Sequence, residues 1–150
     1  MATAWTKSQV TAARGQDEHM DPTRKPGRGM LHIRKSILDF DKIASEAGGS
    51  LAVNDTFQAI NVNAGETILL AGINVLTAAT AAATGDLGFT GGVVDYFVDG
   101  IALNDTTFPS ITTSFSGGMY IASNDTIYLI ALEQSPAGGK VEVWALIARI

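Results

Sequence analysis

The stretch that decides the fold is the C-terminal TIYLIALEQSPAGGKVEVWALIARI, residues 126–150. Two apolar and β-branched runs, 126–132 and 141–150, flank a polar segment that contains the turn-forming Ala137-Gly138-Gly139. Alternate positions of the second run are apolar and fall on one face of a strand: Val141, Val143, Ala145 and Ile147. Trp144 and Leu146 project from the other face. We therefore predict two strands, the second of which pairs within a sheet as far as its last residues.

Apolar runs and turn residues continue to alternate upstream. Further strands are predicted at residues 57–62, 67–77, 86–89, 93–98 and 119–122, and Asp99-Gly100 predicts a hairpin turn that leads into 101–103. Residues 67–77 are apolar on both faces, which predicts burial between two layers. Eight or nine short strands at this spacing are typical of a mainly β, antiparallel β-sandwich of jelly-roll type. The pattern leaves the order of the strands open.

The sandwich is predicted to begin close to residue 31. Leu31, Ile33 and Ile37 indicate a strand whose apolar residues face the core and whose Arg34 and Lys35 face solvent. One short helix is predicted to follow, with Asp39 as its N-cap, apolar residues at helical spacing from Phe40, and Gly48 as its stop. Residues 31–150 therefore form the predicted β-sandwich domain.

Residues 1–30 form a predicted extended N-terminal arm. They contain two prolines and three glycines, and few apolar residues; Ala2 to Arg14 is expected to be helical only once it is docked, with Trp5 as an anchor. Residues 1–35 hold seven of the ten Lys and Arg and three of the fifteen Asp and Glu, which is a net charge of +4 against −9 for the rest. Such asymmetry indicates an arm with its own partner, although a solvated tail is the alternative.

The partner of this arm is expected to be an acidic protein surface. Acidic residues interrupt the basic ones, and the acidic body would repel nucleic acid, so we predict no nucleic-acid partner. The longest apolar stretch, 68–75, is far shorter than the ~20 residues that span a bilayer. Residues 1–7 also lack the apolar segment of a signal peptide, so we predict no membrane partner and synthesis in a cytoplasm.

No residue constellation indicates a reaction. The absence of Cys removes thiolate metal sites and thiol nucleophiles, and the two histidines, His19 and His32, are interpreted as surface residues. The spacing of the densest acidic group matches no calcium-binding loop, and its members are assigned to turns and to an outward strand position: Asp86, Asp95, Asp99 and Asp105. We predict no catalytic residue, no metal site and no cofactor, and hence no enzyme.

Several segments of residues 31–150 resemble a family of small virion structural proteins of tailed bacteriophages, of the capsid decoration (cement) type. The segments are Leu38-Asp39-Phe40, INVNAGET at 60–67, VLTAAT at 75–80, GDLG at 85–88 and VDYFVDG at 94–100. Asn63 stands where such relatives often have Pro, a tolerable change in a turn. The arm is outside the resemblance.

The resemblance implies a non-enzymatic protein on the outer surface of a phage capsid, which cements the shell as a homotrimer bound to the major capsid protein. We expect Trp5 to bury against the shell while the basic side chains of the arm pair with capsid acids: Lys7, Arg14, Arg24, Lys25 and Arg28. A fibre, tail or adaptor component is the alternative function. A glycan-binding module that uses outward-facing aromatic rings is the second alternative.

Overall fold

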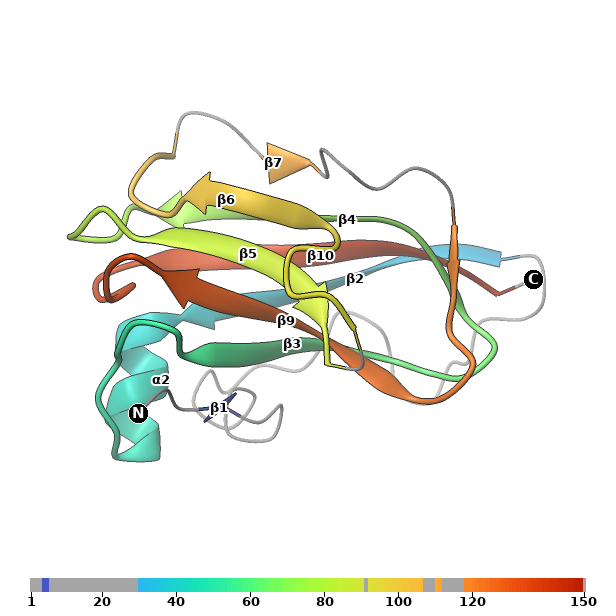
Figure 1. The fold of residues 1–150 in the computed structure, drawn as a ribbon, viewed down its shortest axis with the longest axis horizontal. Helices are drawn as coiled ribbons and strands as arrows, with labels where there is room; N and C mark the ends of the chain where they lie inside the picture. The colour runs from blue at the N-terminus through green and yellow to red at the C-terminus, as the bar shows by residue number, and fades with distance from the viewer. Residues whose placement is uncertain (1–3, 6–29, 91, 107–109, 112–117, 150) are drawn as a thin grey trace.

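The computed structural model describes residues 4–5, 30–90, 92–106, 110–111 and 118–149, which form two facing β-sheets (Figure 1). One sheet contains, in spatial order, β1 (Ala4–Trp5), β3 (Thr56–Val62), β9 (Asp125–Leu132), β5 (Thr84–Phe89) and β6 (Val98–Ala102). The other contains β2 (Met30–Asp39), β10 (Lys140–Arg149), β4 (Thr67–Thr77) and, on the same edge of β4, β7 (Ser110–Ile111) and β8 (Met119–Tyr120). Every pairing is antiparallel except that of β1 with β3.

The strand order is that of a jelly roll. β9 inserts between β3 and β5 in one sheet, and β10 inserts between β2 and β4 in the other. With β7 and β8 counted as one interrupted edge strand, and β1 set aside, each sheet has four antiparallel strands. The mainly β, jelly-roll-like sandwich expected from the sequence is therefore confirmed, and the structure supplies the order that the sequence left open.

The core lies between the two sheets, and β10 shows why the strands form where they do. Val141, Val143, Ala145 and Ile147 are all fully buried, whereas Trp144 and Leu146 are half-buried on the opposite face. This confirms the predicted alternation. β10 also has a partner on each side along nearly its whole length, so it is the central strand of its sheet.

The helix α2 (Phe40–Ala47) has the ends that its sequence predicts. The carboxylate of Asp39 accepts a hydrogen bond from the backbone N–H of Lys42, and Gly48 ends the helix in the left-handed region at φ 71°. Phe40 and Ile43 are fully buried, and the Phe40 ring meets that of Phe57 edge-on at a centroid distance of 4.9 Å. Figure 1 shows α2 at one end of the sandwich, next to the end of β2.

The strand β2 faces the opposite way from the prediction. Leu31 and Ile33 are 61% and 52% exposed, whereas Arg34 is 2% exposed and lies on the inner face. β4 differs too: Leu70 and Leu76 are exposed, so only one face of that strand is covered by the other sheet. The reason for the inverted β2 is an ion pair described below.

The predicted strand 93–98 and the turn at Asp99-Gly100 are wrong. Residues 93–97 form the connection between β5 and β6, and β6 runs through Asp99 and Gly100. This connection lies directly on β5, because a Cβ at Gly88 would be only 2.2 Å from the carbonyl oxygen of Val93. Packing of the Tyr96 ring on Phe89, at a centroid distance of 5.2 Å, holds it there. Ala4–Trp5, within the segment expected to be helical once it is docked, form strand β1 in the single chain.

Two isoleucines on paired strands test the orientation of β2. Ile147→Ala is expected to lower the free energy of unfolding by about 2–5 kcal/mol, because Ile147 is fully buried. Ile33→Ala, on the outer face of the neighbouring strand, is expected to cost less than about 1 kcal/mol. Urea unfolding followed by circular dichroism measures both, and equal losses would contradict the orientation.

Candidate functional site

The inner face of β2 carries a buried ion pair. Two guanidinium nitrogens of Arg34 donate to the two carboxylate oxygens of Glu66, at 2.8 and 2.6 Å, and the two side chains are 2% and 1% exposed. Arg34 also donates to the carbonyl oxygen of Asn61 at 2.8 Å, and Glu66 accepts from the backbone N–H of Asn63 at 2.8 Å. The pair therefore joins β2 to the turn between β3 and β4, across the two sheets.

This ion pair fixes which face of β2 is inside. Side chains of a strand alternate between faces, so a buried Arg34 places His32 and Ser36 inside and Leu31 and Ile33 outside. Removing Arg34 from its partner would leave a buried charge, which typically costs about 3–5 kcal/mol. If Leu31 and Ile33 turned inward, Arg34 would leave Glu66. The free energy lost with this ion pair would exceed the free energy gained by burying the two apolar side chains.

His32 is part of this polar interior and is not the surface residue predicted from the sequence. Both of its ring nitrogens are shielded from solvent, and the described residues offer them no hydrogen-bond partner. Burial and the neighbouring positive charge of Arg34 lower the pKa of His32, although the charge of Glu66 opposes them. Burial raises the pKa of Glu66, but the hydrogen bonds from Arg34 and the backbone of Asn63 outweigh it, so that pKa is lowered.

The outer face of the same sheet carries exposed apolar side chains in adjacent rows. The strand register aligns Ile33, Leu146 and Leu70 in one row. It aligns Leu31, Ala148, Thr67 and Tyr120 in the next. Leu70 is 37% exposed and Tyr120 66%. Residues directly opposite on paired strands share a face and lie in contact range, so these side chains form a continuous surface.

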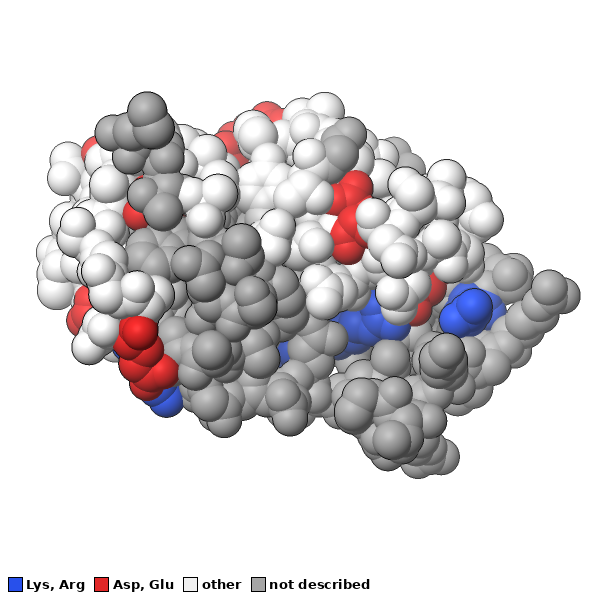
Figure 2. All heavy atoms as spheres, turned by 90° about the horizontal axis from the view of Figure 1, so that it is seen from below, with Lys and Arg blue, Asp and Glu red and all other residues white. Residues whose placement is uncertain are grey.

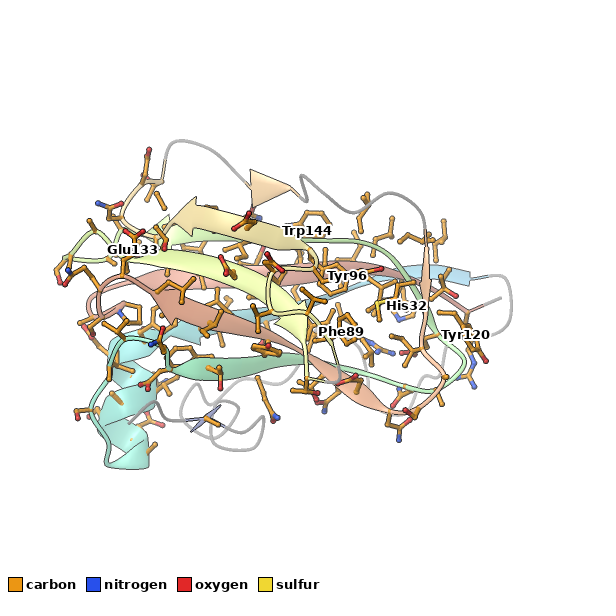
Figure 3. All side chains as sticks on the ribbon, viewed as in Figure 1. His32, Phe89, Tyr96, Tyr120, Glu133 and Trp144 are labelled. Carbon is orange, nitrogen blue, oxygen red and sulfur yellow. The ribbon has the colours of Figure 1, made fainter. Side chains whose placement is uncertain are left out.

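We name this surface the apolar face and define it by six residues: Leu31, Ile33, Leu70, Tyr120, Trp144 and Leu146. Figure 3 places Tyr120 at the end of the sandwich where β2 begins, away from α2, with Trp144 nearer its middle. Trp144 aligns with Lys35 on one side and Gly72 on the other. Contiguous apolar surface of this kind on a folded domain indicates a binding surface.

The outer face of the sheet becomes charged toward α2. Lys35 pairs with Glu142 at 3.4 Å, and the same carboxylate accepts from the side-chain amide of Asn74 at 3.2 Å. Lys140 pairs with Asp39 at 3.7 Å. Toward α2 the outer face of this sheet therefore carries charge pairs, whereas the six residues that define the apolar face, next to residue 30, are uncharged.

Asp86, one of the acidic residues that the sequence groups together, lies in a different setting from the one predicted. No group of three or more His, Asp or Glu among the described residues is placed to hold an ion. Asp86 lies within β5, not at the predicted turn, is 6% exposed, and accepts from the backbone N–H of Gly100 at 2.7 Å. Burial raises its pKa, the Gly100 hydrogen bond opposes this, and the charges of Asp99 and Asp95 raise it further. The Asp86 carboxylate therefore has a structural role: its hydrogen bond to Gly100 joins β5 to β6.

Of the six predicted arm residues, only Trp5 lies within the described residues. Its backbone is in β1, aligned with Phe57 of β3. The other five lie outside the described ranges: Lys7, Arg14, Arg24, Lys25 and Arg28. The apolar face and the Arg34–Glu66 pair were not predicted from the sequence. The signal for them was the alternation of apolar and polar residues over 31–34, which was assigned to the wrong faces.

Charged residues are distributed unevenly along the chain and over its surface. Residues 30–150 contain five basic and twelve acidic residues, whereas residues 1–29 contain five and three. On the side shown in Figure 2, uncharged residues cover most of the described surface, and charged side chains occupy separate small areas. The helix of the described region is too short and polar to cross a membrane.

Acidification tests the polar interior. A lowered pKa keeps His32 neutral in the folded state, so the unfolded state binds more protons and stability falls as pH drops below the ordinary value of 6.5. Glu66 adds a second loss as pH falls below 4.5 toward its lowered pKa. We expect the urea midpoint to fall between pH 7 and 5, and this fall to be smaller in His32→Gln. The same pH dependence in both proteins would contradict the placement of His32.

The sequence matches no protein-family model and no curated protein. Solved structures do share the fold. A chain in the capsid of Ralstonia phage GP4 superposes with a TM-score of 0.62 at 11% identity, over 88% of this chain and 92% of that chain. A chain in the capsid asymmetric unit of cyanophage Pam1 gives 0.57 at 14% identity, over 88% and 96%.

A third likeness is to a chain in the acidic stable capsid structure of Helicobacter pylori bacteriophage KHP30. Its TM-score is 0.54 at 14% identity, over 81% of this chain and 89% of that chain. Each comparison covers nearly the whole of the other chain, so the likeness extends over the entire jelly roll and not over a few strands. The fold of this protein is therefore one that occurs in the capsids of three phages.

Proposed function

We propose that this protein is a structural component of a phage virion that binds to the outside of the capsid and stabilises it. The apolar face carries the proposal, because it gives a chain with a capsid-type jelly roll a surface that a partner would bury. In this proposal the partner is the major capsid protein, and three copies of the chain act together where capsomers meet.

The apolar face and the basic arm form one continuous binding region in this account. Residue 30 joins the arm to β2, and Leu31 and Ile33 follow at once on the outer side of the sheet. Burial of this apolar surface against the shell favours binding. Basic side chains then select an acidic area of the shell.

The six arm residues keep the roles predicted from the sequence. The Trp5 ring is proposed to contact the shell, while the basic side chains pair with capsid acids: Lys7, Arg14, Arg24, Lys25 and Arg28. Each exposed ion pair contributes only about 0–1 kcal/mol. Affinity therefore depends on several pairs in each arm and on three arms acting together.

Binding to capsids tests this function. The variant with Arg14, Arg24, Lys25 and Arg28 all replaced by Gln is expected to bind expanded capsids at least about tenfold more weakly, since four charge pairs are lost in each arm. Co-sedimentation with expanded capsids that lack decoration protein measures the bound fraction.

The matched control replaces two basic residues of the body, Lys42→Gln and Lys140→Gln, and should leave binding unchanged. Both lysines are exposed and make surface ion pairs, Lys42 with Glu46 at 3.8 Å and Lys140 with Asp39 at 3.7 Å. Binding of the quadruple variant at the level of the unmodified protein would reject the role of the arm, and no binding by the unmodified protein would reject the function.

A further inference from the structure

The ring nitrogens of His32 lie inside the sandwich, shielded from solvent, and have no hydrogen-bond partner among the described residues. The Ser36 hydroxyl and the Nε of Arg34 are buried and unpartnered in the same way. These three residues occupy successive inward positions of β2, because side chains two residues apart share a face of a strand. Buried polar atoms are normally paired. The row therefore carries an unfavourable desolvation that contact with water would remove.

Two charged groups act on the His32 ring. Arg34 lies two residues along β2, and Glu66 belongs to the turn between β3 and β4. β3 itself carries no charged residue, whereas β10 aligns the apolar Ile147 with His32 and ends at the basic Arg149. Both carboxylate oxygens of Glu66 already accept from Arg34. A proton on His32 would therefore add a second buried positive charge where one carboxylate serves the first.

The start of β2 offers this ring a short route to water. Met30 and Leu31 pair with the last two residues of β10, so His32 is only two residues from the end of its strand. Figure 3 places His32 at the same end of the sandwich as Tyr120. Pairs at the end of a strand open at a lower free energy than pairs in the middle of a sheet. Opening of residues 30–33 would give both ring nitrogens access to solvent.

The same short segment carries part of the apolar face. Leu31 and Ile33 flank His32 in the chain and are both exposed on the outer side of the sheet. They hold these outward positions, aligned with Ala148 and Leu146 of β10, only while the ring between them points inward. An opening that hydrates His32 therefore removes Leu31 and Ile33 from the apolar face.

The ion pair connects this event with another part of the apolar face. The backbone N–H of Ile121 donates to the carbonyl oxygen of Glu66, and the N–H of Gly65 donates to the carbonyl oxygen of Ile121, both at 2.8 Å. Tyr120, which belongs to the apolar face, directly precedes Ile121. Separation of Arg34 from Glu66 would weaken the anchoring of the turn that holds this segment.

We propose that protonation of His32 opens the first residues of β2, so that the apolar face is assembled at neutral pH and loses Leu31 and Ile33 in acid. The closed state holds the neutral ring, and the open state accepts the proton. A lowered pKa of His32 in the closed state has the required sign, because its stability is then lost as pH falls below 6.5. Release of a bound shell in acid is the consequence that rests on the proposed function.

Hydrogen exchange of the free protein at pH 7 and pH 5 tests the opening without any capsid. After correction for the intrinsic pH dependence of exchange, the protected amides of residues 31–34 should exchange about tenfold faster at pH 5, because protonation favours the open state. The middle of β9 and of β10 should keep its protection. No acceleration at residues 31–34, or an equal acceleration in every strand, would overturn the proposal.

The chain has only two histidines, so a matched pair of variants identifies the titrating group. His32→Gln should abolish the acceleration, whereas His19→Gln should retain it. Acceleration that persists in His32→Gln would overturn the role of His32. Should His32→Gln fail to fold, NMR of the unmodified protein answers the same question, with His19→Gln to assign the two ring signals. The His32 ring should titrate below its ordinary pKa, and titration at the ordinary value would overturn the proposal.

Capsid binding at the same two pH values separates this inference from the proposed function. Co-sedimentation with expanded capsids should show the unmodified protein bound at pH 7 and released at pH 5, and His32→Gln bound at both. Equal binding of the unmodified protein at both pH values would contradict the acid release. Faster exchange at residues 31–34 in a protein that binds capsids at neither pH would reject the virion function and leave the opening of β2 standing.

Discussion

The buried pair of Arg34 and Glu66 is the interaction on which the rest of this structure depends. It is bidentate, it is almost fully shielded from water, and it joins β2 to the turn between β3 and β4. A charge buried without its partner is more unfavourable than two exposed apolar side chains, so the pair decides which face of β2 is inside. Leu31 and Ile33 are on the surface as a consequence, and the apolar face exists because of a polar contact in the core.

This arrangement links folding to function. A strand that followed its hydrophobic pattern would have a charged outer face and a dry interior, with no apolar surface for a partner. The inverted strand instead has polar His32, Arg34 and Ser36 inside and apolar residues outside, next to the junction with the arm. Natural sequences depart from simple patterning mainly at functional positions. The departure in β2 therefore supports the placement of the binding region there.

Much of the fold was accessible from the sequence, and the exceptions have physical causes. β10 and α2 were predicted well because local signals agree there: strict alternation in one case, an Asp N-cap and a Gly stop in the other. β2 was predicted with the wrong face inward because its register depends on Glu66, a partner 32 residues away that no local pattern includes. Residues 93–97 were predicted as strand because they are rich in β-branched and aromatic residues, whereas in the structure Tyr96 packs on Phe89 of β5 from a turn, and Val93 and Val94 are exposed.

In the candidate site too, some features could be predicted from the local sequence and others depend on contacts between distant residues. The basic composition of the arm is visible in the sequence, but the edge on which Ala4–Trp5 lie and the apolar face require the pairing of distant strands. The jelly-roll order also depends on such pairings, since β9 and β10 insert between strands that precede them by many residues. Local periodicity determines where strands occur, and long-range contacts determine which surfaces they present.

The reactivity of a single thiol at residue 33 tests the central claim most directly. In a chain with no other Cys, Ile33→Cys on the outer face of β2 should react with a thiol reagent at nearly the rate of an unfolded peptide. Once the protein is bound to capsids, the same thiol should be protected. Slow reaction in the free protein would contradict the outward orientation of β2, and full reactivity on the capsid would contradict the apolar face as the binding surface.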